Sequence, residues 1–235
     1  MRFGAVPSAD DFLEVSAVLK RSNTLRILVL LGGLALASAC AAQPDAKGPY
    51  TKGKEYVELP APYQRDSDGG KVEVVEVFSY GCIHCAHFAP TAAKLAKELP
   101  KGVVFKLLPA PFNAEWLPFA RAYYAANKLG VVARTHLQLF DAKFSEHYPM
   151  NTLGELADFY AREGVDRDKF MKLATSPEAT AQLKQDLALI QHWQVDGTPS
   201  LVVDGKYRVT DNVNSQQEMA DVALWLAKRE LARQK

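Results

Sequence analysis

The sequence predicts an α/β domain into which an all-helical subdomain is inserted. A β-branched run, a segment of helical period and a second β-branched run follow one another between residues 72 and 108. Only helical patterns occur from about residue 114 to 194, and strand patterns return at residue 200. The 235 residues, of which 48% are hydrophobic, suffice to bury one sizeable core with an attached subdomain.

The charge balance excludes one broad class of function. Lys and Arg number 28 against 27 Asp and Glu, which leaves a formal net charge of +1. Such a chain has no global field that would attract nucleic acid or an acidic surface. Nucleic-acid binding is therefore not expected.

Residues 1–42 read as a secretory signal region. An apolar run from Ile27 to Ala42 follows three basic residues and ends in the small residues Ala37-Ser38-Ala39. The run is short for a stable membrane span. We therefore expect export to the periplasm, a linker over residues 43–54 that is rich in Pro, Gly, Lys and Asp, and a folded domain over residues 55–235.

Cys40 has two interpretations. The segment Leu36-Ala37-Ser38-Ala39-Cys40 resembles a bacterial lipobox, in which the cysteine becomes the lipidated first residue of the mature protein. The usual leucine stands one position out of step, however, and ordinary signal cleavage at the same Ala-x-Ala explains the segment equally well. A lipid on Cys40 would tether the protein to a membrane.

The first half of the domain follows the order strand, helix, strand. Val72–Phe78 is a β-branched run of strand length that leads directly into Cys82-Ile83-His84-Cys85. The helix that starts there has one apolar face and stops before Pro100. Its apolar positions are Phe88, Ala92, Leu95 and Leu99. Val103–Leu108 is the second strand.

Caps and turns organise the second half. The segment Thr152–Glu155 fits a capping box, Gly164 marks the end of that helix, and Ser176-Pro177 starts another. Ser200–Val203 and Tyr207–Val209 flank the turn residues Asp204-Gly205, a pattern typical of a β-hairpin. A capping box at Ser215–Glu218 then opens a closing helix, whose apolar stripe is Met219, Val222 and Leu226.

The Cys-x-x-Cys carries the chemistry. At a helix start, the Cys82 sulfur meets unsatisfied backbone N–H groups and the positive end of the helix dipole, both of which stabilise a thiolate. The Cys85 sulfur lies about one turn further in, shielded but within disulfide reach. Next to a strand-helix-strand unit, this motif is typical of a thioredoxin-like fold, with Cys82 as the attacking thiol and Cys85 as the resolving thiol.

His84 tunes the pair in this interpretation. It can donate a hydrogen bond or positive charge to the Cys82 thiolate and so favour the reduced form, although a solvent-exposed turn histidine would look the same in sequence. Zinc binding by Cys82, Cys85 and nearby histidines is the alternative from another class. The remaining histidines, His136, His147 and His192, form no cluster in the sequence, so no metal site is expected.

Two separated segments resemble the DsbA family. They are Phe78-Ser79-Tyr80-Gly81-Cys82-Ile83-His84-Cys85 and Gly197-Thr198-Pro199-Ser200-Leu201-Val202-Val203-Asp204-Gly205-Lys206-Tyr207. The resemblance extends over nearly all of the chain after about residue 50. It implies a thioredoxin-like fold with a helical insertion, and a periplasmic thiol:disulfide oxidoreductase that donates disulfides to exported proteins. No prosthetic group is implied, because the redox group is the Cys82–Cys85 disulfide itself.

The resemblance also assigns residue roles. It makes Cys82 the nucleophile, Cys85 the resolving cysteine, His84 the thiolate stabiliser and Pro199 a cis-proline packed against the disulfide. Thr198 and Pro199 would hold the substrate backbone. Glu76 would be a buried carboxylate that relays a proton to or from Cys85, whereas an outward-facing strand residue, as we expect for Glu73, is the other interpretation.

Two positions depart from the family pattern. Ile83 replaces the proline usual between the cysteines, and Leu107, with Lys106 beside it, stands where the family often has a buried lysine opposite the carboxylate. The redox potential and the proton relay are the properties that these two positions affect.

The function expected from the sequence is oxidation of reduced exported proteins by a monomer that a DsbB-type membrane quinone oxidoreductase reoxidises. A disulfide isomerase or reductase on the same fold is the nearest alternative, but only a short linker precedes Tyr56, where isomerases usually carry a dimerisation domain. A periplasmic metal-binding module that uses Cys82, Cys85 and His87 is the second alternative.

Overall fold

A five-stranded mixed sheet forms the centre of the fold in the computed structural model, which describes residues 48–66 and 69–234. The strands are β1 (Tyr56–Glu58), β2 (Val72–Phe78), β3 (Val103–Pro109), β4 (Ser200–Val203) and β5 (Tyr207–Val209). They lie in the order β1-β5-β4-β2-β3. β2 pairs in parallel with β3 and antiparallel with β4, so the strand that leads to the cysteines is flanked on both sides.

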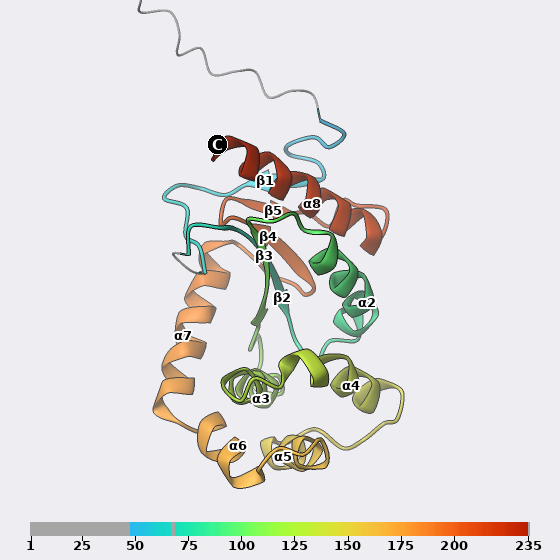
Figure 1. Ribbon diagram of the computed structural model, residues 1–235, viewed down its shortest axis with the longest axis vertical. Coiled ribbons are helices and arrows are strands. Elements are labelled where there is room, and N and C mark those ends of the chain that lie inside the picture. The colour runs from blue at the N-terminus through green and yellow to red at the C-terminus, as the bar shows by residue number, and fades with distance from the viewer. Residues whose placement is uncertain (1–47, 67–68, 235) are drawn as a thin grey trace, which may run out of the picture. The chain divides into compact units, whose positions relative to one another are not determined.

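Helices cover both faces of this sheet (Figure 1). One face is covered by α2 (Ile83–Glu98) and α8 (Gln216–Arg233), and α7 (Pro177–His192) lies against the other. Side chains alternate along β2. Val72 and Val74 pack on the α2 and α8 side, whereas Val75 and Val77 pack with Ile190 of α7 on the opposite side.

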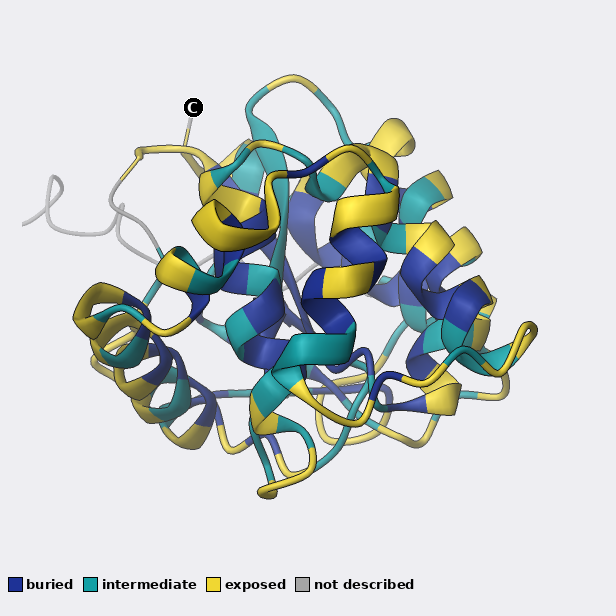
Figure 2. Cartoon of the chain, turned by 90° about the horizontal axis from the view of Figure 1, so that it is seen from below, coloured by how far each residue is buried: buried dark blue, intermediate teal, exposed yellow. Residues whose placement is uncertain are grey.

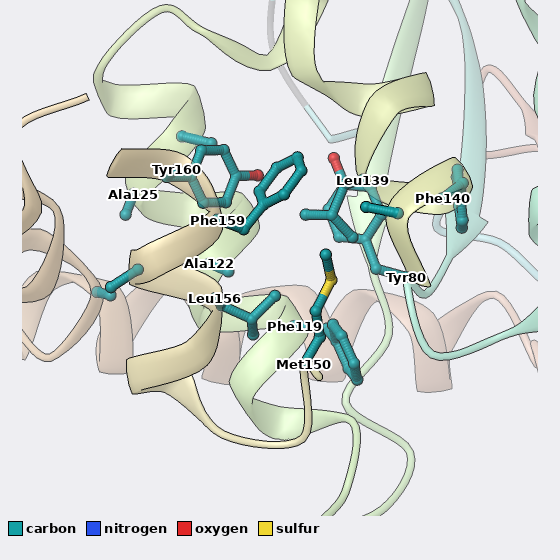
Figure 3. Close-up of a cluster of buried hydrophobic side chains, with 14 of the residues drawn as sticks. Tyr80, Phe119, Ala122, Ala125, Leu139, Phe140, Met150, Leu156, Phe159 and Tyr160 are labelled. Carbon is teal, nitrogen blue, oxygen red and sulfur yellow. The ribbon is translucent and has the colours of Figure 1, made fainter. Parts of the chain in front are cut away.

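The helical stretch expected over residues 114–194 contains five helices inserted between β3 and β4. They are α3 (Leu117–Lys128), α4 (Val132–Phe144), α5 (Leu153–Arg162), α6 (Arg167–Ala174) and α7. Viewed from below, these helices turn buried faces inward and exposed faces outward (Figure 2). Their shared core includes Phe119, Leu139, Leu156 and Tyr160 (Figure 3). Phe78 and Cys85 belong to the same cluster, so this core continues to the cysteine pair.

Several local signals act as predicted. Thr152 and Glu155 form the reciprocal capping box of α5, and the Ser176 hydroxyl caps α7 ahead of Pro177.

Asp204 and Gly205 both have positive φ, 53° and 63°, which gives the hairpin turn the twist that its strands require. At α8 the Ser215 hydroxyl accepts from the Glu218 N–H. The Glu218 carboxylate, however, accepts from Asn214 and not from the Ser215 N–H, so the predicted capping box is only half formed.

The amino-terminal stretch contacts the fold earlier than its composition suggested. The Tyr50 ring meets the Trp225 ring of α8 edge-on at 5.7 Å between centroids, and the three-residue strand β1 follows. The signal region over residues 1–42, with Cys40, lies outside the described residues. Within the part of the chain that is described, no helix is long and apolar enough to cross a membrane.

Candidate active site

A short turn after β2 delivers Cys82 to the start of α2. The Ser79 carbonyl accepts from the Cys82 N–H at 3.1 Å, and the Ser79 hydroxyl accepts from the Gly81 N–H at 3.0 Å. Cys82 is the N-cap residue of α2, with extended backbone angles, and Ile83 is the first helical residue. The first sulfur therefore lies where the free N–H groups of the helix point, as the motif predicts.

The two cysteines differ sharply in environment. Cys82 retains 7% of its surface exposed, whereas Cys85, within the first turn of α2, has none. Both are thiols in this structure. A substrate sulfur can therefore reach only Cys82.

The Cys82 thiolate is strongly stabilised. A hydrogen bond from the Cys85 thiol is the largest cause that lowers the pKa of Cys82, which falls from its ordinary value to about 5 against the opposing effect of burial. The Thr198 hydroxyl and the backbone N–H groups of Cys85 and His84 lower this pKa further. Cys82 is thus predominantly a thiolate at neutral pH.

Cys85 titrates in the opposite direction. Burial raises the pKa of the Cys85 thiol, and the neighbouring Cys82 sulfur raises it further. Because the pKa values of the two thiols move apart, a single proton stays on Cys85 in the reduced pair. This arrangement provides one nucleophile and one protected thiol.

The Thr198–Pro199 segment faces the cysteines, and its peptide bond is cis. In its thiol form, Cys82 Sγ donates to the Thr198 carbonyl oxygen at 3.4 Å. Thr198 Oγ1 is buried and has no hydrogen-bond partner among the described residues, so its hydroxyl is available to the thiolate. The structure thus brings together the two segments that are far apart in the sequence.

His84 lies on the exposed surface of the first turn of α2. Its ring centroid is 6.5 Å from that of His87, and its carbonyl oxygen accepts from Gln216 Nε2 at 3.1 Å. Only its backbone N–H is among the groups that lower the pKa of Cys82. The hydrogen bond from Gln216 to the His84 carbonyl oxygen joins the first turn of α2 to the first turn of α8.

Glu76 is buried in the middle of β2, with 1% of its surface exposed. Burial raises the pKa of this carboxyl to about 8, and the Cys82 thiolate contributes to the rise. Its strand partners are Leu107 and Leu201, and Glu76 Oε2 has no hydrogen-bond partner among the described residues. Glu76 is therefore a protonated carboxyl at neutral pH, near the cysteine pair but without a cationic partner in its register.

The expectation that Glu73 is an exposed strand acid is wrong. Glu73 has 1% of its surface exposed, and Lys106 Nζ lies 3.0 Å from its carboxylate. Lys106 also reaches Asp66 at 2.8 Å. The lysine beside Leu107 thus belongs to an ion cluster with Glu73, on the side of β2 that faces away from Glu76.

Three features of the site were missed from sequence. They are the effect of the Thr198 hydroxyl on the pKa of Cys82, the Ser79 turn, and Trp116, against which Gly81 packs. A Cβ added at Gly81 would lie 2.7 Å from the Trp116 ring. The dipeptides Thr198-Pro199 and Gly81-Cys82 can both be read from the sequence. No local pattern shows, however, that Thr198 lies beside Cys82 or that Trp116 lies against Gly81.

The described residues contain no group of three or more His, Cys, Asp or Glu side chains placed to hold a metal ion. His84 and His87 are neighbours on the surface of α2, while Cys85 is fully buried.

A mixed sheet, a Cys-x-x-Cys at a helix start and a facing cis-proline define a thioredoxin-like domain of the dithiol-disulfide class. Residues 73–223 match the family model of the DSBA-like thioredoxin domain. The chain is 39% identical over 211 residues to the thiol:disulfide interchange protein DsbA of Pseudomonas aeruginosa, covering 88% of this chain and 98% of that protein.

Solved structures agree with this assignment. The crystal structure of Pseudomonas aeruginosa DsbA matches with a TM-score of 0.73 and 38% identity, covering 78% of this chain and 96% of that one. The oxidoreductase DsbA of Xylella fastidiosa matches with a TM-score of 0.73 and 37% identity, covering 78% and 98%. The chain belongs to the DsbA family and is a thiol:disulfide oxidoreductase.

Proposed function

We propose that this protein is a periplasmic oxidant that donates the Cys82–Cys85 disulfide to reduced cysteines of exported proteins. The observation that carries the proposal is the low pKa of Cys82, about 5, beside a buried Cys85. Stabilising the thiolate stabilises the reduced pair, and a pair that is stable when reduced is a strong oxidant, a relation that DsbA proteins exemplify. The Cys82–Cys85 disulfide itself accepts the two electrons, so the reaction uses no prosthetic group.

The exchange takes two steps. A substrate thiolate attacks Cys82 Sγ, the Cys82–Cys85 bond breaks, and Cys85 leaves as a thiolate that takes up a proton. The second substrate thiolate then attacks the substrate sulfur of the mixed disulfide and releases Cys82 as a thiolate. Two electrons pass from the substrate dithiol to the cysteine pair. Of the two substrate protons, one ends on Cys85 and one goes to solvent.

We assign Glu76 as the group that exchanges the proton with Cys85. A carboxyl with a pKa of about 8 holds its proton at neutral pH and can give it to a thiolate. Thr198 and Pro199 would hold the substrate backbone beside Cys82, and His84, in the exposed first turn of α2, would stabilise the Cys82 thiolate.

The cycle closes when a DsbB-type membrane quinone oxidoreductase removes the two electrons. We place the protein in the periplasm, exported by its first 42 residues, with Cys40 either a lipid anchor or part of an ordinary signal-cleavage site. The mass of the mature protein from membranes tests this anchor, because lipidation at Cys40 adds acyl chains that simple cleavage does not.

The reduction potential of the Cys82–Cys85 pair, equilibrated against glutathione buffers, tests the direction of transfer. A potential well above that of the glutathione pool is expected for an oxidant. A low potential, like that of thioredoxin, would overturn the proposal and make a reductase or isomerase the working hypothesis, with Ile83 as the first residue to examine.

A further inference from the structure

A cavity of about 370 Å³ opens next to the cysteine pair, on the side of the helical subdomain. Its lining residues are Gly81, Glu115, Trp116, Phe119, Lys143 and Asn151. Gly81 immediately precedes Cys82 in the chain, so one wall of the cavity is the peptide neighbour of the sulfur that receives substrates.

The floor of the cavity is aromatic and held in place. The Trp116 ring lies directly against Gly81, and the backbone N–H of Trp116 donates to Asn113 Oδ1 at 2.8 Å. The Phe112 ring stacks on Trp116 at 6.2 Å between centroids. Phe119 is 4% exposed and is anchored in the helical core next to Met150 (Figure 3). Such a floor suits the methylene groups of a side chain.

Lys143 brings a positive charge to this apolar floor. Its Nζ lies 4.8 Å from the centroid of the Phe119 ring and 5.6 Å from that of Phe144. Burial alone lowers the pKa of Lys143, and no described carboxylate forms an ion pair with it. Glu115 lines the same cavity but is exposed, so water screens its charge. A partly desolvated ammonium gains more from a carboxylate than a surface lysine does.

A substrate residue next to the target cysteine lies close enough to Cys82 for its side chain to reach the cavity. In a mixed disulfide, the substrate Cα lies about 4.4–6.8 Å from the Cys82 Cα, and the following residue is about 3.8 Å further along the substrate chain. Gly81 is itself about 3.8 Å from Cys82 along the enzyme chain. A flanking side chain can therefore enter a cavity that begins at Gly81.

We propose that this cavity is a substrate subsite, in which Lys143 binds the carboxylate of an acidic side chain that flanks the target cysteine while Trp116 and Phe119 contact its methylene groups. The inference rests on the exchange at Cys82 proposed above. It makes Lys143 a specificity residue, because it contacts the substrate beside the reacting sulfur.

The test uses two-cysteine peptides that differ only in the residue after the first cysteine, which is Glu, Gln or Phe. Stopped-flow rate constants for their oxidation by the oxidised protein are divided by the rates of the same peptides with glutathione disulfide, which removes differences in peptide thiol reactivity. The wild type should prefer Glu to Gln by about threefold to fivefold, the size expected of one ion pair, and salt should reduce this preference.

In the variant Lys143→Met the normalised Glu to Gln ratio should fall to about one, while Lys143→Arg should keep the preference. Lys128→Met is the matched control, since Lys128 also lies over an aromatic ring, 5.4 Å from the Tyr124 centroid, but outside the cavity. It should leave the ratio unchanged.

The subsite would be overturned by no preference for Glu in the wild type, or by a preference for Glu that survives in Lys143→Met. A preference for Phe that Lys143→Met leaves intact would assign the cavity to aromatic side chains instead and would also overturn the acidic assignment. Oxidation of dithiothreitol reports the exchange at Cys82 separately, so failure of the chemistry is distinguishable from failure of the subsite.

Discussion

The buried carboxyl of Glu76 makes the protein sensitive to alkaline pH. The pKa of Glu76 is about 8 in the folded chain against an ordinary value of 4.5, so between these two pH values the folded state holds a proton that the unfolded state has lost. Stability therefore falls as pH rises through this window. Because the side chain is fully buried, Glu76 lowers the free energy of unfolding at pH 8 by about 4 kcal/mol.

The variant Glu76→Gln should remove this cost. Reduced Glu76→Gln should unfold at higher urea concentration than the reduced wild type at pH 8, and the difference should nearly vanish at pH 4.5 or below, measured by urea unfolding at both pH values. Glu73→Gln is the control on the same strand, since it breaks the pair with Lys106 and should destabilise the protein at pH 8. Equal stability of wild type and Glu76→Gln at pH 8 would contradict the pKa given to Glu76.

The hydroxyl of Thr198 offers a second prediction at this scale. Thr198→Val keeps the shape of the side chain but removes a donor that lowers the pKa of Cys82. The pKa of Cys82 should rise above about 5 and the reduction potential should fall, because the thiolate loses stabilisation. The ultraviolet absorbance of the thiolate, titrated with acid, measures this pKa. If the titration is unchanged in Thr198→Val, the low pKa of Cys82 is due to the Cys85 thiol and the backbone N–H groups alone.

At the scale of elements, α4 contacts the end of β2 through Phe140 and through the partly buried imidazole of His136. The His136 ring lies 5.3 Å from those of Phe78 and Tyr80, and its Nδ1 is 3.0 Å from the Tyr80 hydroxyl. Burial lowers the pKa of His136 to about 4. Since the unfolded state takes up a proton near pH 6.5 and the folded state does not, stability falls as pH drops from 6.5 to 4.

The variant His136→Phe should therefore lose less stability on acidification. It retains an aromatic ring but leaves the Tyr80 hydroxyl without its partner, so it should be the less stable protein at pH 7. Between pH 7 and 4 the wild type should lose about 3 kcal/mol more than the variant, measured by urea unfolding at each pH. Parallel pH profiles for the two proteins would show that His136 is not buried as a neutral ring.

Elements were predictable where the signal is local. β2, β4 and β5 have the predicted bounds, and Cys82 is the N-cap of α2, because runs of β-branched residues and turn residues act over a few positions. The strand β1 was missed, since its three residues are held by pairing with β5. Glu73 was misassigned for the same reason: its partner Lys106 comes from the neighbouring strand, and no local pattern shows the pairing.

At the scale of the whole molecule, the low pKa of Cys82 couples redox state to folding. The reduced folded chain holds a thiolate above pH 5, whereas an unfolded cysteine keeps its proton to about pH 9, so the Cys82 thiolate alone contributes a gain in stability as pH rises between these values, opposite to the contribution of Glu76. The oxidised protein has no thiolate and lacks this gain.

The stability difference between reduced and oxidised protein should therefore grow in favour of the reduced form by about 2 kcal/mol from pH 5 to pH 7. Unfolding both redox forms in urea at these pH values measures it, and the Glu76→Gln background removes the carboxyl that responds to the same thiolate. A difference that does not change with pH would contradict thiolate stabilisation as the source of oxidising power.

The insertion between β3 and β4 has an evolutionary consequence. Both strands pair with β2, so the points at which the chain leaves and re-enters the sheet are about two strand spacings, or roughly 10 Å, apart. A segment whose ends are so close can change length at its exposed loops without moving β2 or β4, provided that the packing of α7 on the sheet and the core around Phe78 and Cys85 are kept. Selection can thus change which clients such a protein accepts while the electron-transferring pair stays as it is.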